Sequence, residues 1–236
     1  MSTTALVVNA DDFGLAAGVN RGIIRAYERG LVTSTSLMVR GAAAVDAGRY
    51  ARSQPQLAVG LHVDLGEWSY ANGEWTAEYE VVDTGDEHAV TRQLTAQLLR
   101  FAELTGRRPT HLDSHQHVHS AEPVRSVLLR AAECLGVPLR GCDGRIAHRG
   151  DFYGQDGRGK SYPELITVAA FDRIVGSLPA GWTELGCHPA EADDLPAGMY
   201  RDERALELEV LCHPAARRSL THHGIQLRSF AELPPR

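Results

Sequence analysis

The residues best suited to chemistry lie in the stretch 110–119, Thr-His-Leu-Asp-Ser-His-Gln-His-Val-His, which holds four histidines and one aspartate. In an extended backbone, alternation places five side chains on one side: His111, Asp113, His115, His117 and His119. In a helical backbone, His115 and His119 lie one turn apart and still converge. Crowded imidazoles repel one another once charged, so we expect a divalent cation or carboxylates among them. The alternative is a chance run of polar residues in a surface loop.

Two adjacent acids, Asp11 and Asp12, follow the apolar segment 5–9, which reads as a buried strand. The carboxyl ends of such strands are where α/β proteins build their sites. Neighbouring carboxylates repel each other, so one of them requires a cation and the other can keep a shifted pKa. The structural alternative is an Asx-type turn and an N-cap for a helix over residues 15–28.

Three further polar residues occupy corresponding places at predicted strands. His62 lies in the strand expected over residues 57–65, and His188 ends the strand expected over residues 182–189. Arg140, at the end of a short predicted strand, is suited to clamp an anion or a developing oxyanion, although a surface ion pair fits equally well. A single histidine in a strand is more often a core residue than a ligand, so only the set as a whole indicates a site.

The composition excludes several classes of partner. At 236 residues the chain can bury a substantial core, and its formal charge of −6 argues against nucleic acid or an anionic membrane as the partner. Neither a secretory signal nor an apolar run of membrane-spanning length is visible. The four cysteines are scattered without a Cys-x-x-Cys pair, which favours reduced thiols over a structural zinc site. We therefore expect a cytoplasmic protein.

Predicted strands and helices alternate along the chain. Counting the histidine stretch, about seven strands are expected, the others over residues 5–9, 33–39, 57–65, 137–142, 182–189 and 224–230. Helical patterns lie between them, over residues 15–28, 42–53, 88–104, 122–135, 163–178 and 200–211. Polar residues that collect at strand ends are typical of a parallel α/β barrel, so we predict a distorted or incomplete TIM-like barrel. No glycine-rich nucleotide-binding motif is present.

One domain covering residues 1–236 is expected, with two segments that read as long irregular loops, 66–87 and 143–161. The first of these loops carries four aromatic residues in polar surroundings, which is also the composition of a sugar-binding rim.

The chemistry of the set is that of a hydrolytic metal site. A cation held by one aspartate and two histidines keeps open coordination positions, unlike a structural metal. Such a cation polarises a carbonyl or phosphoryl oxygen and lowers the pKa of bound water. A second carboxylate can then accept a proton, and a histidine on the other side can protonate the leaving group.

Four motifs resemble those of the YdjC-like carbohydrate deacetylases, a family that includes the chitooligosaccharide deacetylases. They run in order over nearly the whole chain: residues 8–14 (VNADDFG), 60–62 (GLH), 111–119 (HLDSHQHVH) and 184–190 (ELGCHPA). The resemblance implies a distorted (β/α) barrel that binds one divalent metal ion and removes acetyl groups from N-acetylated amino sugars. It also allows a homodimer. Departures from the family's pattern lie mainly in the loops 66–87 and 143–161, so both loops are expected to determine which substrate is accepted.

The same resemblance assigns roles by position. It makes Asp12, His62 and His115 the metal ligands, Asp11 the base that activates water, and His188 a candidate acid for the departing amine. Four other residues are expected to support these or to face the substrate: Asp113, His117, His119 and Arg140. Asp113 is expected to fix the tautomer of an imidazole. Zinc suits one carboxylate and two imidazoles by softness, whereas family members are described with magnesium, so Mg²⁺ and Zn²⁺ both remain candidates.

Two other functions remain open on the sequence. An amidohydrolase or phosphoesterase with one or two metal ions fits the His-x-His pair of His115 and His117. A sugar-binding protein that needs a metal ion but has no turnover is the non-enzymatic alternative. Asp11 argues against the latter, because binding alone does not need a spare carboxylate beside a ligand.

Overall fold

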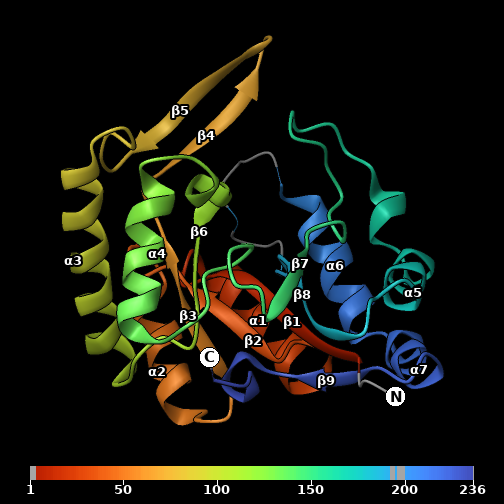
Figure 1. The fold of residues 1–236 in the computed structure, drawn as a ribbon. Helices are drawn as coiled ribbons and strands as arrows, with labels where there is room; N and C mark the ends of the chain where they lie inside the picture. The colour runs from red at the N-terminus through yellow and green to blue at the C-terminus, as the bar shows by residue number, and fades with distance from the viewer. Residues whose placement is uncertain (1–3, 192–194, 196–199, 236) are drawn as a thin grey trace.

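A curved, all-parallel sheet of seven strands forms the centre of the molecule (Figure 1). The computed structural model describes residues 4–191, 195 and 200–235. The main strand order is β6-β3-β2-β1-β8-β7, and β9 pairs with the first part of β1. Their bounds are β1 Thr4–Phe13, β2 Ser34–Leu37, β3 Ala58–Val63, β6 Leu112–Ser114, β7 Ile146–Arg149, β8 Gly181–Cys187 and β9 Gln226–Arg228. This incomplete barrel confirms the predicted fold class.

The central strand β1 is buried over nearly its whole length, because both of its faces and both of its edges are covered. Its apolar residues, among them Leu6 and Val8, are fully buried. Parallel pairing places the carboxyl ends of neighbouring strands at one edge of the sheet. Asp11 and Asp12 therefore emerge at the same edge as the ends of β3, β6 and β8.

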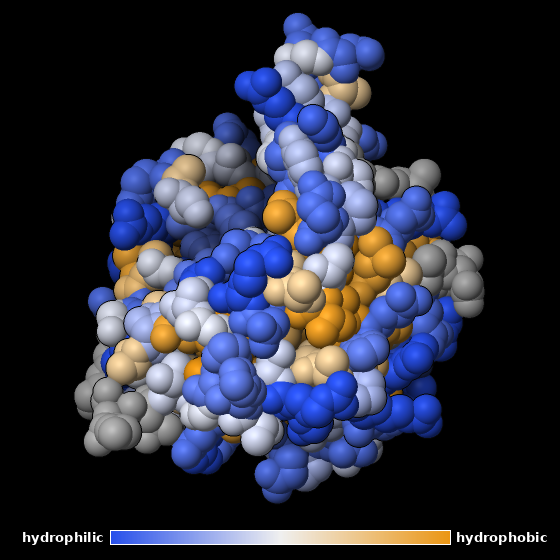
Figure 2. Space-filling model, turned by 90° about the vertical axis from the view of Figure 1, so that its right-hand side faces the viewer, coloured by the Kyte–Doolittle hydropathy of each residue, from blue (hydrophilic) through white to orange (hydrophobic). Residues whose placement is uncertain are grey.

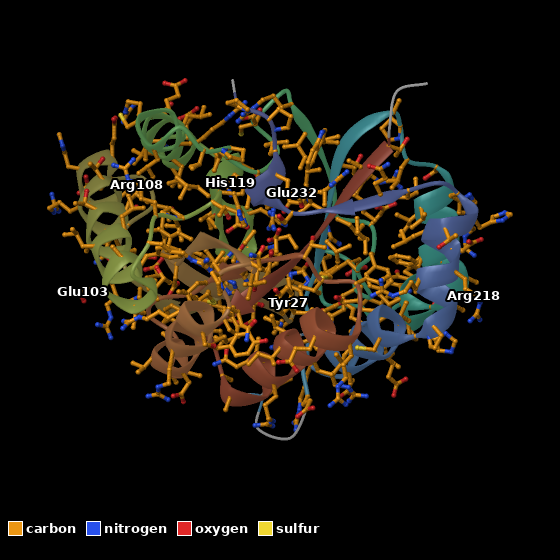
Figure 3. All side chains as sticks on the ribbon, turned by 90° about the horizontal axis from the view of Figure 1, so that it is seen from below. Tyr27, Glu103, Arg108, His119, Arg218 and Glu232 are labelled. Carbon is orange, nitrogen blue, oxygen red and sulfur yellow. The ribbon has the colours of Figure 1, made fainter. Side chains whose placement is uncertain are left out.

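Helices surround the outside of the sheet, and side chains fill the interior (Figures 1 and 3). Their bounds are α1 Ala17–Arg29, α2 Ala44–Ser53, α3 Glu87–Thr105, α4 Val124–Leu135, α5 Val168–Gly176, α6 Asp202–Cys212 and α7 Pro214–His222. Helix α3 is capped at its start by Asp86, whose side chain accepts hydrogen bonds from the backbone N–H groups of His88 and Ala89. It ends at Gly106, which adopts a left-handed φ of 70°. In the described part of the chain, no helix combines the length and the apolar character needed to cross a membrane.

The segment predicted as an irregular loop over residues 66–87 is in large part a regular hairpin. Strands β4 (Gly66–Ala71) and β5 (Glu74–Glu80) pair antiparallel and join through Asn72 and Gly73, whose φ values of 54° and 90° are both positive. An Asn-Gly pair favours this type of tight hairpin turn, a signal that the loop prediction overlooked. The hairpin, called the arm below, stands out from the body (Figure 2).

The strand predicted over residues 137–142 is also corrected. That segment makes only an isolated bridge between Leu139 and Leu112, and a regular strand forms later, as β7 inside the predicted loop 143–161. Pro138 lacks a backbone N–H, and Gly141 adopts a left-handed φ of 67°, so the segment turns instead of extending a ladder.

Candidate metal and catalytic site

The site begins where β1 departs from regular geometry. The register of β1 against β2 shifts between Ala10 and Phe13, and Asp12 adopts a left-handed φ of 68°. Aspartate enters this region more readily than most residues, and an extra residue in a strand redirects the side chains beside it. As a result, adjacent residues that would face opposite sides of a regular strand, Asp11 and Asp12, both come close to His62.

The histidine stretch adopts neither of the two regular forms expected for it. Strand β6 ends at Ser114, and a short 3₁₀ segment, His115–Ser120, follows with Gln116 and His117 at positive φ values of 49° and 53°. These left-handed residues rotate the chain between successive histidines. Consequently, the histidines of the stretch do not converge on one point.

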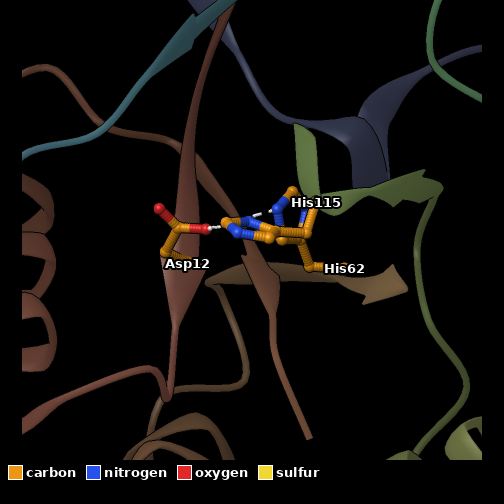
Figure 4. Close-up of side chains that lie close together, drawn as sticks. All are labelled: Asp12, His62 and His115. Atoms are coloured by element: carbon orange, nitrogen blue, oxygen red, sulfur yellow. Dashed lines mark hydrogen bonds and ion pairs between the residues drawn. The ribbon is translucent and has the colours of Figure 1, made fainter. Parts of the chain in front are cut away.

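Asp12, His62 and His115, the residues that the resemblance makes metal ligands, lie close together. Asp12 Oδ1 lies 3.3 Å from His62 Nε2 and 3.2 Å from His115 Nδ1 (Figure 4). All three side chains are buried, and their potential ligand atoms lie within 4.8 Å of one another. Burial opposes ionisation of Asp12, but the Arg204 guanidinium and the two imidazoles outweigh it and hold the pKa of this carboxyl well below its usual range.

Behind His62, a carboxylate fixes the orientation of the ring. Asp113 Oδ1 lies 2.8 Å from His62 Nδ1, which leaves Nε2 facing Asp12. The other oxygen of Asp113 accepts a hydrogen bond from Ser36 at 2.6 Å. Burial favours neutral His62, but the surrounding Asp113 and Asp11 raise its pKa to about 10 without a bound ion. A carboxylate behind an imidazole is the usual support of a metal-binding histidine.

Asp11 belongs to a buried ion network centred on Arg140. The Nη1 and Nη2 atoms of Arg140 donate to its two carboxylate oxygens, both at 2.6 Å, and Asn9 donates to it at 2.9 Å. Arg140 also donates through Nε to Glu184 at 2.8 Å and lies 3.0 Å from Asp113. Burial opposes ionisation of Asp11, but Arg140 outweighs it and lowers the pKa of the carboxyl to about 2. Of the two expectations for Arg140, a surface ion pair is therefore excluded.

His188 lies beside Asp11 and is only partly buried. Its Nε2 lies 3.8 Å from Asp11 Oδ2, and its Nδ1 lies 3.7 Å from Glu207 Oε1. Glu207 is completely buried; it accepts hydrogen bonds from the His188 backbone N–H and from the Tyr200 hydroxyl. The rings of Tyr200 and Tyr153 stack at 4.1 Å and both meet His188 edge-on. Glu207 and the two tyrosines thus restrict the position of the imidazole.

The other histidines of the stretch lie away from this point. His111 is buried beside Ser36, with 3.0 Å between its Nε2 and the Ser36 hydroxyl, and its ring stacks on Phe230 at 3.9 Å. The Nδ1 atom of His119 lies 2.6 Å from the Ser114 hydroxyl. His117 is exposed, and its ring lies 5.7 Å from that of His148. Spacing along the sequence did not distinguish these residues from His115.

Helix α6 contributes two charged side chains that the sequence reasoning missed. Arg204 and Glu207 are buried, and the sequence predicted a helix here but indicated neither residue as part of the site. Arg204 Nη2 donates to Asp12 Oδ2 at 2.6 Å, and Glu207 contacts His188. Their spacing of three residues, which places both on one face of the helix, was the available signal. It is weak, because exposed ion pairs have the same spacing.

The trio of Asp12, His62 and His115 fits a divalent ion. One carboxylate oxygen and two imidazole nitrogens form a common donor set for a catalytic metal with open positions. In addition, the Nε2 atom of His115 is buried and has no hydrogen-bond partner among the described residues, and Glu67 of the arm lies 3.9 Å from it. A second group, Asp11, His62 and Asp113, shares His62 with the first. Its two carboxylates are already engaged by Arg140.

Comparisons with known proteins agree on one family. The family model described as YdjC-like protein matches residues 5–222. A carbohydrate deacetylase from Geobacillus stearothermophilus is 36% identical over 246 aligned positions, which cover 96% of each chain. A chitooligosaccharide deacetylase from Salmonella paratyphi B is 34% identical, with 97% of this chain and 98% of the relative covered.

Solved structures share the architecture. A protein from Enterococcus faecalis, proposed to cleave cellobiose phosphate, is 27% identical with a TM-score of 0.75, and the match covers 98% of this chain and 99% of that one. A family 4 carbohydrate esterase from Streptomyces lividans, solved with acetate, is 13% identical with a TM-score of 0.58, covering 100% of this chain and 98% of that one. At this low identity, the second likeness concerns the fold alone.

Proposed function

Because the chain belongs to the YdjC-like family, we propose that it is a metal-dependent carbohydrate deacetylase that releases acetate from N-acetylated amino sugars. The observation that carries the proposal is the convergence of Asp12, His62 and His115 beside an ionised Asp11 and a partly exposed His188. A hydrolytic site of this kind needs an ion, a proton acceptor and a proton donor within a few ångströms, and this arrangement supplies candidates for each.

Asp12, His62 and His115 would hold the ion. A bound divalent ion would polarise the acetyl carbonyl and lower the pKa of a neighbouring water molecule. We propose one ion and not two, because Arg140 already pairs with Asp11 and Asp113, the carboxylates of the second possible group. This argues against the binuclear amidohydrolase or phosphoesterase alternative. Both Mg²⁺ and Zn²⁺ are candidates, since the imidazoles suit zinc and the carboxylate suits either ion.

Asp11 is proposed as the proton acceptor and His188 as the proton donor. Arg140 lowers the pKa of Asp11 to about 2, so the carboxylate is ionised at neutral pH. A carboxylate this acidic is a weak base, so it would take a proton only from a water molecule that the bound ion has made more acidic. His188 Nε2 points toward Asp11 from 3.8 Å, and its other ring nitrogen faces Glu207. A protonated His188 could give its proton to the amine nitrogen as the carbon–nitrogen bond breaks. The two groups would thus act next to each other on one amide.

The arm and the segment 143–161 are proposed to select the sugar. The arm reaches the site through Glu67, and Gln116, next to His115, hydrogen-bonds the Trp68 backbone at 2.9 and 2.8 Å. From the other side, the Arg158 guanidinium lies 5.5 Å from the ring centre of Tyr70. Two segments that bracket the site and touch each other are well placed to recognise a ring held between them.

Location and assembly are further proposals. Four free cysteines are compatible with a reducing compartment, and we propose that the protein acts in the cytoplasm. A homodimer is also proposed, and light scattering or sedimentation would measure it directly.

Acetate release tests the proposed function. Metal-loaded protein is incubated with N-acetylglucosamine and its oligomers, and free acetate is measured for wild type, Asp11→Asn and Asp64→Asn. Asp64 is a matched control, because it is a buried carboxylate just beyond the end of β3 that pairs with Arg40 and Tyr79 and not with the trio. We expect release by wild type, severe loss of kcat in Asp11→Asn, and a near-normal kcat in Asp64→Asn, because loss of a bond at the base of the arm should act on KM. Full activity in Asp11→Asn would remove Asp11 from the mechanism.

A further inference from the structure

Arg204 makes a contact that the proposed reaction does not explain. It lies on α6, is 7% exposed, and donates through Nη2 to Asp12 Oδ2 at 2.6 Å. Its position is fixed at two further points: Nε donates to the Tyr200 carbonyl at 2.9 Å, and the Arg204 carbonyl accepts from Ala190 N–H at 3.2 Å. A buried cation beside a carboxylate that is to bind another cation is electrostatically unfavourable unless it has a role.

The contact divides the two oxygens of Asp12 between different partners. Oδ1 faces both imidazoles, at 3.3 Å from His62 and 3.2 Å from His115. Oδ2 is turned away from them and held by Arg204. Unless Arg204 moves, Asp12 can offer an ion one oxygen and not two.

We propose that Arg204 is a positioning residue that makes Asp12 a one-oxygen ligand and weakens its hold on the metal ion. The inference rests on the proposed function, because it takes the trio as the metal site. A one-oxygen carboxylate leaves more coordination positions free for water and the acetyl oxygen. A neighbouring positive charge also lessens how far the carboxylate neutralises the ion, which keeps the ion more strongly electron-withdrawing.

The charge effect determines the direction of the expected change. Arg204 and a divalent ion would share one buried carboxylate, where screening by water is weak and like charges repel strongly. Removing the guanidinium removes that repulsion and frees Oδ2. Without Arg204 the Asp12 carboxylate is also less firmly oriented, which by itself weakens metal binding. Asp12 nevertheless stays restrained by its own backbone turn and by contact with two buried imidazoles. Metal binding should therefore become tighter and not weaker.

The test compares zinc affinity, measured by calorimetric titration of metal-free protein, in wild type, Arg204→Gln and Arg204→Lys. Arg40→Gln is the matched control, because Arg40 pairs with the buried Asp64 at 3.2 Å outside the trio. We expect Arg204→Gln to bind Zn²⁺ on the order of tenfold tighter, similar in size but opposite in direction to the loss caused by removing a carboxylate or carbonyl partner of a metal ligand. Arg204→Lys should fall between it and wild type, since the charge stays but the planar fork is lost. Arg40→Gln should match wild type.

Cobalt substitution gives a second measurement that does not depend on turnover. A second carboxylate oxygen on Co²⁺ raises the coordination number and lowers the intensity of its visible absorption, so Arg204→Gln should show a weaker band than wild type. Unchanged or weaker zinc binding in Arg204→Gln, together with an unchanged cobalt spectrum, would overturn the proposal. If Arg204→Gln does not fold, the same two measurements on Arg204→Lys decide.

The two proposals fail in different ways. Tighter zinc binding in Arg204→Gln without acetate release by wild type would count against the proposed function alone. Acetate release by wild type with no change in zinc affinity or cobalt spectrum would count against the role of Arg204 alone.

Discussion

Asp11, Asp12 and Arg140 form the buried floor of the site. They are at most 3% exposed and each is ion-paired, whereas most residues of the arm are exposed. The floor lies at the ends of strands that are hydrogen-bonded within the main sheet. The arm is a separate two-stranded sheet attached at its base. Reacting groups must be held rigidly, while recognition of different sugars tolerates a surface that adjusts. Changes in the floor should therefore affect chemistry and folding, and changes in the arm should affect substrate binding.

Asp64 links the two regions. It accepts hydrogen bonds from the Tyr79 hydroxyl at 3.0 Å and from the Gly66 N–H at 3.1 Å. Its own N–H donates to the side chain of Gln97 on α3 at 2.9 Å. A two-stranded hairpin is marginally stable alone, so these bonds at its base fix where the arm leaves the body.

The largest effect is expected at the floor, for Asp12→Asn. This change removes the only carboxylate of the trio, so the protein should lose stoichiometric metal binding, and acetate release should fall by at least about a thousandfold. Metal content after gel filtration and the rate of acetate release measure the two losses. Retention of one tightly bound ion per chain would show that the trio is not the metal site.

Arg140→Met should cause the next largest effect, on stability. The change leaves Asp11, Asp113 and Glu184 buried without their shared cation, so the free energy of unfolding should fall by about 3–5 kcal/mol. Urea unfolding followed by circular dichroism measures it. For comparison, Arg130→Met removes an exposed partner of Glu87 and should cost about 1 kcal/mol or less. Equal losses in the two variants would contradict the assignment of Arg140 to a buried network.

His111 predicts how stability depends on pH. Burial lowers its pKa to about 4, against 6.5 for an ordinary histidine. Between these two pH values, His111 is protonated in the unfolded chain and neutral in the folded one. Stability contributed by neutral His111 is complete above pH 6.5 and is lost as the pH falls toward 4. The shift corresponds to about 3 kcal/mol.

The measurement is the free energy of unfolding at pH 7.0 and at pH 4.5 for wild type and His111→Gln. Wild type should lose more stability than the variant over this interval. Parallel pH curves for the two proteins would mean that His111 is not held neutral in the fold.

The smallest effect on stability is expected in the arm. Trp75 is 54% exposed and packs against Tyr70 with ring centres 5.4 Å apart. Trp75→Ala should change the free energy of unfolding by less than about 0.5 kcal/mol. It should raise KM for oligomers several-fold with little change in kcat, because Trp75 would stabilise the bound substrate and the transition state equally. Leu99→Ala on α3, at 64% exposure, is the control for loss of an exposed apolar side chain. An unchanged KM would separate the arm from substrate recognition.

The sequence was most informative where local pattern and chemistry coincide. Apolar strands followed by polar residues predicted the parallel sheet and indicated that Asp11, Asp12, His62 and His188 would meet at one edge. The histidine stretch was over-interpreted, because its direction depends on two left-handed residues, Gln116 and His117. Such backbone conformations leave no reliable signal in residue types.

The partners of the site were the least predictable. Arg204 and Glu207 lie on a helix whose sequence is charged on several sides, so their three-residue spacing is only a weak sign that they are buried. They become buried because α6 packs close to the end of β8, a tertiary contact that helical periodicity does not encode. Arg140 was noticed, but its pairing with Asp11 spans 129 positions along the chain.

The metal dependence of acetate release tests the central claim most directly. Chelator-treated protein is divided into two portions, one of which receives one equivalent of Zn²⁺ or Mg²⁺, and both are given N-acetylglucosamine oligomers. We expect no acetate release without metal and full release at one ion per chain, with no further gain from a second ion. Undiminished release by metal-free protein, or a requirement for two ions per chain, would contradict it.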